Sequence, residues 1–213
     1  MTVTDIKREK KHLCRLEFLG GKEVLIDLDI VNEYTIHKED TLSEEKLSEI
    51  IEASDYHRAK QRALWYLDRA AHTEKGLYDK LIKAGFKKKA SAKVIARFCD
   101  LGLLDDRRYA ENFADRCIAA NVSKRETFRK LILKGIPRDL AEAVLADNEV
   151  DELSQIRQII DKKYRLKLET AENTQKVYAA LIRKGFSFSA VRDALKSYSE
   201  ELMLAQEEFS EEF

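Results

Sequence analysis

The sequence predicts a mainly α-helical protein that contains three tandem three-helix repeats behind a small N-terminal β-hairpin and helix. The first observation is a segment that recurs every fifty residues, at Leu77–Phe86, Thr127–Ile136 and Val177–Phe186. The second is a glycine at the same place in each copy, which is typical of a helix end. The third is the composition, with 37% charged residues and a single proline in 213 residues. An internal repeat of this length is typical of stacked helical units.

Each copy of the repeat carries the signals of one short helix and the start of the next. Aligned residues supply an N-cap, an apolar stripe, a glycine stop and an apolar residue behind it. Ser123 and Glu126 have the spacing of a capping box, and Pro137 lies where a helix start accepts proline. The aligned positions are Thr73, Ser123 and Asn173; Tyr78, Phe128 and Tyr178; Leu81, Leu131 and Leu181; Ile82, Ile132 and Ile182; Gly85, Gly135 and Gly185; and Phe86, Ile136 and Phe186.

The N-terminal region reads as a hairpin followed by short helices. Alternating apolar residues predict strands over 12–18 and 23–28, and the Gly20-Gly21 pair between them predicts a tight turn. Lys7–Lys11 is expected to be an exposed basic run. A helical turn is predicted over 30–36 and a helix from Leu42 to about Ala53. A two-stranded hairpin is marginal alone, so we expect it to dock on a helix.

The chain is then divided by the repeat. We expect an N-terminal region over 1–54, repeats over 55–104, 105–147 and 148–198, and an acidic tail over 199–213. In repeat one the apolar face of the first helix includes Ala59, Ala63 and Leu67, widened by Leu64, Trp65 and Tyr66. The aromatic and leucine positions are interpreted as core. The third helix of each repeat is expected to begin near residues 90, 140 and 190.

Charge is distributed unevenly although the formal net charge is zero. Residues 1–56 carry 8 basic and 14 acidic side chains, residues 57–197 carry 31 and 19, and residues 198–213 carry none and 6. The repeats therefore form a basic body between two acidic ends. Such a body favours nucleic acid or an acidic protein surface as partner.

The sequence shows no arrangement of residues that indicates catalysis or a bound metal. Three cysteines and four histidines are scattered without disulfide or metal-ligand spacing, and phosphate-loop and hydrolase motifs are absent. Asp105 and Asp106 are interpreted as a helix cap rather than a Mg²⁺ site. We expect a non-enzyme without cofactor or metal. The lack of a long apolar run or an apolar N-terminal segment favours a cytoplasmic, non-membrane protein.

Two sequence features resemble a known family. The helix ends KLIKAGF, KLILKGI and ALIRKGF, and the junction DLGLLDDRRYAENF at Asp100–Phe113, resemble the RecX family of bacterial recombination regulators, over roughly residues 57–197. The family pattern is broken where Ala84 replaces a basic residue and where Gly76 interrupts a helix. The resemblance implies a monomeric, elongated, bent arm of three-helix repeats. It also implies binding to the RecA recombinase filament, with inhibition of its ATPase, strand-exchange and co-protease activities, and single- or double-stranded DNA as a second candidate partner.

Basic residues of the repeats are the candidate contacts with that filament or with DNA. The Lys87–Lys89 cluster precedes a helix, where cations oppose the helix dipole, and this indicates a use outside the helix. The set comprises Lys87, Lys88, Lys89, Arg97, Arg107, Arg108, Arg116, Lys124, Arg125, Arg129 and Lys134. Two other functions stay open: a stand-alone DNA-binding protein of tandem helix–turn–helix-like units, and a generic helical-repeat interaction scaffold.

Overall fold

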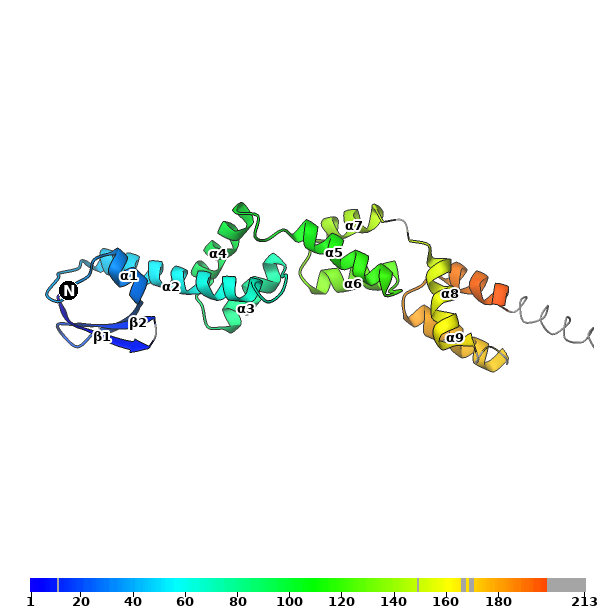
Figure 1. The fold of residues 1–213 in the computed structure, drawn as a ribbon, viewed down its shortest axis with the longest axis horizontal. Coiled ribbons are helices and arrows are strands. Elements are labelled where there is room, and N and C mark those ends of the chain that lie inside the picture. The colour runs from blue at the N-terminus through cyan, green and yellow to red at the C-terminus, as the bar shows by residue number, and fades with distance from the viewer. Residues whose placement is uncertain (11, 149, 166–167, 169–170, 199–213) are drawn as a thin grey trace, which may run out of the picture. The chain divides into compact units, whose positions relative to one another are not determined.

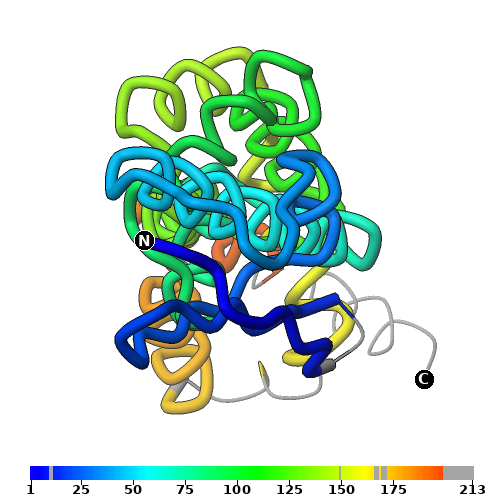
Figure 2. The backbone as a smooth tube through the Cα atoms, turned by 90° about the vertical axis from the view of Figure 1, so that its left-hand side faces the viewer, coloured from blue at the N-terminus to red at the C-terminus, as the bar shows by residue number. Residues whose placement is uncertain are grey.

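The computed structural model describes residues 1–10, 12–148, 150–165, 168 and 171–198. The chain separates into two compact units, Met1–Asp105 and Asp106–Phe213, and each is described by itself. Figure 1 and Figure 2 show that helices dominate both units and that the strands are confined to the N-terminal end. The mainly helical fold class is therefore confirmed. The predicted acidic tail, residues 199–213, lies outside the described residues.

The N-terminal sheet has three antiparallel strands rather than two. They are β1 (Val3–Lys10), β2 (Leu13–Phe18) and β3 (Glu23–Asp27), in the spatial order β1-β2-β3. The predicted strands correspond to β2 and β3, and Gly20 and Gly21 take the positive φ values expected for the turn, +97° and +82°. Residues 7–9 of the basic run are exposed as expected, but the strand that contains them was not predicted. Lys7, Arg8 and Lys10 pair with residues of β2.

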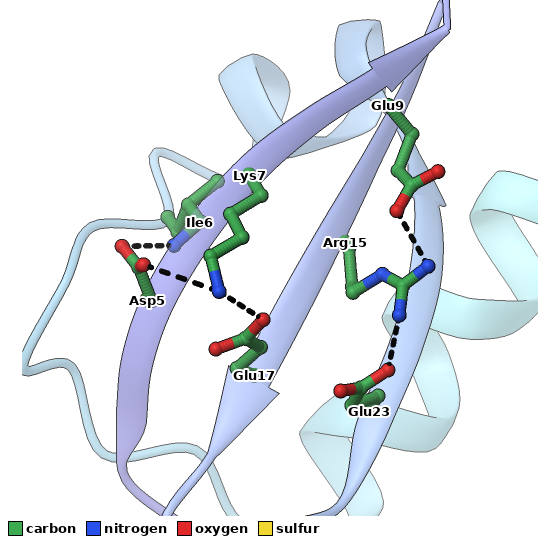
Figure 3. Close-up of polar contacts among 7 residues, drawn as sticks. All are labelled: Asp5, Ile6, Lys7, Glu9, Arg15, Glu17 and Glu23. Atoms are coloured by element: carbon green, nitrogen blue, oxygen red, sulfur yellow. Dashed lines mark hydrogen bonds and ion pairs between the residues drawn. The ribbon is translucent and has the colours of Figure 1, made fainter.

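The two faces of this sheet have opposite chemistry. Alternate residues of β2, including Leu16 and Phe18, are buried against α1 (Leu28–Glu33) and the start of α2. On the other face, Lys7 pairs with Glu17 and Arg15 bridges Glu9 and Glu23, as Figure 3 shows. Cross-strand ion pairs of this kind solubilise the open face and fix the register. The hydrogen bond that Lys7 donates to the Glu17 carboxylate raises the pKa of Lys7.

A single long helix joins the sheet to the first repeat. The helix α2 spans Glu44–Leu67 and is capped by Ser43, whose Oγ accepts a hydrogen bond from Lys46 N. Separate helices on either side of residue 54 were predicted, but the structure has no break there. Ser54 is buried, and its Oγ accepts the backbone N–H of Asp27 at 2.8 Å. The N-terminal half of α2 thus belongs to the sheet, while its C-terminal half packs on α3 (Glu74–Lys83) and α4 (Lys88–Asp100).

The second unit repeats this three-helix arrangement twice. Its first three helices are α5 (Asp106–Ala119), α6 (Lys124–Leu133) and α7 (Arg138–Ala146). They are followed by α8 (Glu152–Lys163), α9 (Ala171–Arg183) and a helix over residues 188–198. Each set of three surrounds its own apolar cluster, centred on Leu131 in one and on Leu181 in the other. The aligned leucines of all three repeats, Leu81 included, are fully buried.

The glycine stop has the same geometry in every repeat. Gly85, Gly135 and Gly185 have φ values of +89°, +90° and +90°, which place them in the left-handed region. The residue after each glycine donates its backbone N–H to the carbonyl of the aligned leucine. The N···O distances are 3.1, 3.1 and 3.4 Å in repeats one, two and three. Together with the glycine N–H bond to the aligned isoleucine carbonyl, this is a Schellman motif. The predicted helix ends are confirmed.

The predicted N-caps are correct in two repeats and wrong in the third. Thr73 and Ser123 accept the N–H groups of Gly76 and Glu126. Asn173, however, lies inside α9, which begins at Ala171 and is three residues longer than α3 or α6. The Glu126 half of the predicted capping box also differs, because its carboxylate accepts two hydrogen bonds from Arg129.

Candidate cationic interface

Helix termini carry most of the eleven predicted contact residues. In the first unit Lys87–Lys89 form the start of α4 and Arg97 lies in its last turn. In the second unit the residues come from the two ends of α5, the first half of α6 and the end of α6. These are Arg107, Arg108, Arg116, Lys124, Arg125, Arg129 and Lys134. All eleven side chains belong to exposed residues.

The lysine cluster before α4 is engaged within the chain. Lys87 Nζ lies 2.7 Å from Asp55 Oδ2, and Lys89 Nζ lies 2.6 Å from Glu52 Oε1, both on α2. The hydrogen bond from Lys89 lowers the pKa of the Glu52 carboxyl. These pairs fasten the start of α4 to α2, which accounts locally for two of the three lysines. Among the described residues, no ion pair engages Lys88.

Arg129 is partly neutralised by its own helix. Its Nε and Nη2 each donate to a Glu126 oxygen at 2.7 Å, and this bidentate bond lowers the pKa of the Glu126 carboxyl. Lys130 Nζ is 3.9 Å from the same carboxylate. A pocket of about 520 Å³ lies beside them, and Arg183 and Lys184 also line it. One carboxylate and four cations therefore surround this depression between repeats two and three.

The remaining exposed cations form a distinct group. Within the described part of the chain, no ion pair engages Lys88, Arg97, Arg107, Lys124 or Arg125. Four of them lie in the first turn of a helix, where the dipole disfavours positive charge. Arg97 is in the last turn of α4, which the dipole favours. The first-turn cations are the residues whose placement costs stability without a compensating partner in the fold.

Two of the predicted cations lie against aromatic rings. Tyr109 and Phe113 are nearly parallel on α5, with an interplanar angle of 8°. Lys134 Nζ lies 5.0 Å from the Phe113 ring centre, and the Arg116 guanidinium lies 5.9 Å from it. Cations at these distances interact favourably with the ring face.

The prediction that Trp65 widens the apolar face of the first helix of repeat one was wrong. This side chain is 44% exposed on the outer face of α2. The Arg69 guanidinium lies 3.6 Å from its ring centre and that of Arg62 lies 5.3 Å away. The sequence did hold a signal, since arginines three residues before and four residues after Trp65 must share its helix face.

One group of side chains in the described part of the chain has ligand atoms close enough to hold a metal ion: Asp27, Asp29 and His57. His57 Nδ1 lies 3.3 Å from an Asp27 oxygen, and Nε2 lies 3.7 Å from an Asp29 oxygen. Because the two carboxylates face different ring nitrogens, the imidazole bridges them instead of sharing one centre with them.

Comparison with known proteins identifies the architecture. Residues 59–98 match the family model of the first three-helix domain of RecX, and residues 149–195 match that of the third. The regulatory protein RecX of Streptococcus pneumoniae serotype 19F (strain G54) is 28% identical over 196 residues, which are 91% of this chain and 76% of that protein. The chain belongs to the RecX family.

Further RecX proteins agree with this assignment. The regulatory protein RecX of Streptococcus mutans serotype c is 27% identical over 92% of this chain and 76% of its own length. A crystal structure of regulatory protein RecX superimposes with a TM-score of 0.68 and 20% identity, over 92% of this chain and 98% of the other. RecX from Lactobacillus salivarius gives 0.61 and 23%, over 69% and 98%. These two structures show that the fold is shared.

The matched RecX domains also locate the exposed features. The first-domain match contains Trp65, the Lys87–Lys89 cluster and Arg97, and the third-domain match contains the α9 stop at Gly185. No described helix combines the length and the apolar character that crossing a bilayer requires. The relatives are named regulatory proteins, which agrees with the expectation of a regulator.

Proposed function

We propose that this RecX-family protein binds the RecA recombinase filament and inhibits its ATPase, strand-exchange and co-protease activities. The observation that carries the proposal is a set of exposed first-turn cations that no ion pair engages among the described residues: Lys88 in α4, Arg107 in α5, and Lys124 and Arg125 in α6. Positive charge there opposes the local dipole, so an anionic partner outside the chain explains its placement. A recombinase filament that encloses DNA is such a partner.

The mechanism follows from how the cations are presented. Arg107 lies in the first turn of α5, and Lys124 and Arg125 lie in the first turn of α6, so all three are presented at helix N-termini. Stacked repeats expose extended surfaces that can contact neighbouring subunits of a polymer. Binding across subunits would block filament extension or promote disassembly without any chemical step by this protein.

The test is the RecA ATPase rate on single-stranded DNA, titrated with this protein at two salt concentrations. Inhibition well below one protein per recombinase subunit is expected, weakening at the higher salt. Neutralising Arg107, Lys124 and Arg125 together with glutamine should weaken inhibition. If these side chains meet single-strand phosphates, the salt slope should also fall, by about 2.

The matched control removes the same number of charges from the acidic N-terminal region. Lys22, Lys38 and Lys46 are exposed and lie outside the repeats. Their triple glutamine variant should inhibit as the parent does. Equal loss in the two triple variants would attribute the effect to net charge, and undiminished inhibition in the first variant would exclude the first-turn cations as contacts.

A further inference from the structure

We propose that the outer face of α2 around Trp65 binds single-stranded nucleic acid, with an unpaired base stacked on the indole ring. This inference concerns a ligand of the chain alone and does not rest on contact with the recombinase. It assigns a role to the exposed tryptophan and its arginines, which the cationic interface described above does not use.

Trp65 is held in place for stacking. The Arg69 side chain turns back along the helix, donates from Nη1 to the Trp65 carbonyl at 2.8 Å, and lays its guanidinium 3.6 Å from the ring centre. Tyr66 meets the indole edge-on, at a centroid distance of 5.2 Å. An aromatic ring fixed in this way pays little conformational entropy when a second planar group stacks on it.

The surroundings of the ring are cationic. Arg62 and Arg69 both lie within reach of the indole, and Lys80 Nζ lies 4.9 Å from the Tyr66 ring centre. Single exposed apolar side chains are common on soluble proteins and need no ligand. An exposed ring flanked by several cations is different, because aromatic platforms beside positive charge are how proteins hold unpaired nucleotides.

A depression next to the indole has room for a nucleotide. Its volume is about 880 Å³, and Trp65, Arg58 and Arg62 form part of its lining. Asp27 and Asp29 lie in the same lining. Their carboxylates would repel phosphate and accept N–H groups of a base, so the backbone of a bound strand should lie toward the arginines.

Repeat two carries the same kind of pair at the matching place. Aligned on the buried alanine pairs of their first helices, the two repeats have an arginine and an aromatic ring three residues apart, in opposite order. The alanines are Ala59 and Ala63 in α2 and Ala110 and Ala114 in α5; the pairs are Arg62 and Trp65 in one, and Phe113 and Arg116 in the other. The pairing thus recurs on the first helix of repeat two, where Phe113 packs partly against the core of its own repeat.

The geometry favours single strands over duplex. In a duplex the base faces are stacked on one another and a tryptophan reaches only groove edges and phosphates. Unpaired bases can leave the stack and lie on aromatic or guanidinium planes. Trp65 offers an aromatic plane and Arg69 a guanidinium plane, and the two groups lie against each other.

The chain contains one tryptophan, so its fluorescence reports this site directly. We would titrate the full chain with an oligothymidylate of about 20 nucleotides, longer than one stacking site requires. Strong, saturable quenching is expected. A duplex with the same number of nucleotides should quench much less. Equal quenching by both would indicate a general effect of charge and overturn the stacking proposal.

Substitutions test whether Trp65 is the ring that binds the base, with the affinity measured from the fluorescence anisotropy of a labelled oligothymidylate. Trp65→Ala should weaken binding about 5- to 150-fold, whereas Trp65→Phe, which keeps an aromatic face, should lose much less. Phe188→Ala is the matched control, since Phe188 is 62% exposed but belongs to the third repeat. Far-UV circular dichroism would confirm that each variant is folded.

Unchanged affinity in Trp65→Ala, or an equal loss in Phe188→Ala, would overturn the assignment. The outcome is separable from that of the ATPase test. Loss of oligothymidylate binding with intact recombinase inhibition would support the Trp65 site and place it outside the recombinase contact. Absence of oligothymidylate binding by the parent protein would overturn this inference and leave the proposed function standing.

Discussion

Replacing Gly185 with alanine tests how repeats two and three are joined. A Cβ at this position would lie 2.7 Å from Ser123 Oγ, closer than such atoms approach. Ser123 Oγ donates to the Lys184 carbonyl at 2.6 Å and accepts from Glu126 N at 3.3 Å, so it links the end of α9 to the start of α6. The substitution therefore strains a helix stop and an N-cap at once.

Comparison with Gly85 separates the expected loss of stability in Gly185→Ala into a backbone part and a part due to Ser123. Gly85 has the same positive φ, but a Cβ there would meet nothing within 4 Å. Gly85→Ala should cost only the left-handed backbone term, about 1–2 kcal/mol. Gly185→Ala should add the loss of the Ser123 cap, about 1 kcal/mol, and of its bond to Lys184, about 1 kcal/mol.

The assay is chemical denaturation followed by far-UV circular dichroism, with hydrogen exchange of residues 106–198 to follow the second unit alone. In a Ser123→Ala background the hydroxyl is gone, so Gly185→Ala should cost about as little as Gly85→Ala, about 1–2 kcal/mol. Equal costs of the two glycine substitutions in the parent background would show that the joint yields without loss, and the explanation from Ser123 would be wrong.

Three further outcomes are expected. Ser54→Ala should destabilise the first unit by about 1–3 kcal/mol, because the buried N–H of Asp27 loses its acceptor, and Trp65 fluorescence would report the unfolding. The pKa of Glu126 is lowered by Arg129, so its stabilising contribution should be present above the ordinary glutamate pKa and be lost as the pH falls through the lower folded value; carboxyl NMR titration measures this. Burial raises the pKa of the Cys14 thiol, so native protein should be alkylated there far more slowly than unfolded protein, as peptide mass spectrometry would show.

Each of these has a control in the same chain. Ser48→Ala changes an exposed serine of α2 and should be neutral. Glu142→Gln, which removes an exposed ion pair with Arg138, should change the free energy of unfolding little. Cys99, half-buried in α4, should be alkylated faster than Cys14. Comparable rates at the two thiols, an ordinary pKa for Glu126, or equal effects of the two serine substitutions would contradict the respective reasoning.

The helix stops could be predicted because their cause is local. A residue in the left-handed conformation must end each short helix, and glycine adopts that conformation at the least cost. The residue after the glycine then donates its backbone N–H to the carbonyl of the aligned leucine. Asn173 shows the limit of the alignment. It is in register with Thr73 and Ser123, yet α9 begins at Ala171, three residues before the position aligned with the first residues of α3 and α6.

The continuity of α2 depends on distant contacts instead. Ser54 interrupts an apolar pattern and resembles a helix boundary, but the sheet supplies the N–H of Asp27 to its buried hydroxyl. The strand β1 was missed for a related reason. Its charged residues are acceptable in a strand because Lys7 pairs with Glu17 and Glu9 pairs with Arg15, both on β2.

The candidate site was predictable only as a composition. Sequence indicates that the repeats are basic, but not that Lys87 and Lys89 are paired with α2, nor that Trp65 faces outward. The groups with which a long charged side chain pairs depend on which helices pack beside it. The spacing of Arg62, Trp65 and Arg69 was the one local clue, and it concerned which face of the helix they share rather than whether that face is buried.

The repeats differ where their surfaces, rather than their cores, are compared. The aligned pair on the second helix is Asp79-Lys80 in repeat one, Arg129-Lys130 in repeat two and Ala179-Ala180 in repeat three. The buried leucine and the glycine stop are common to all three, so these changes leave the fold intact. Because cationic pairs at this position are confined to repeat two, binding to an anionic partner through the second helices should depend most on α6. The same framework thus carries a different surface in each repeat, and the function is set by those surfaces.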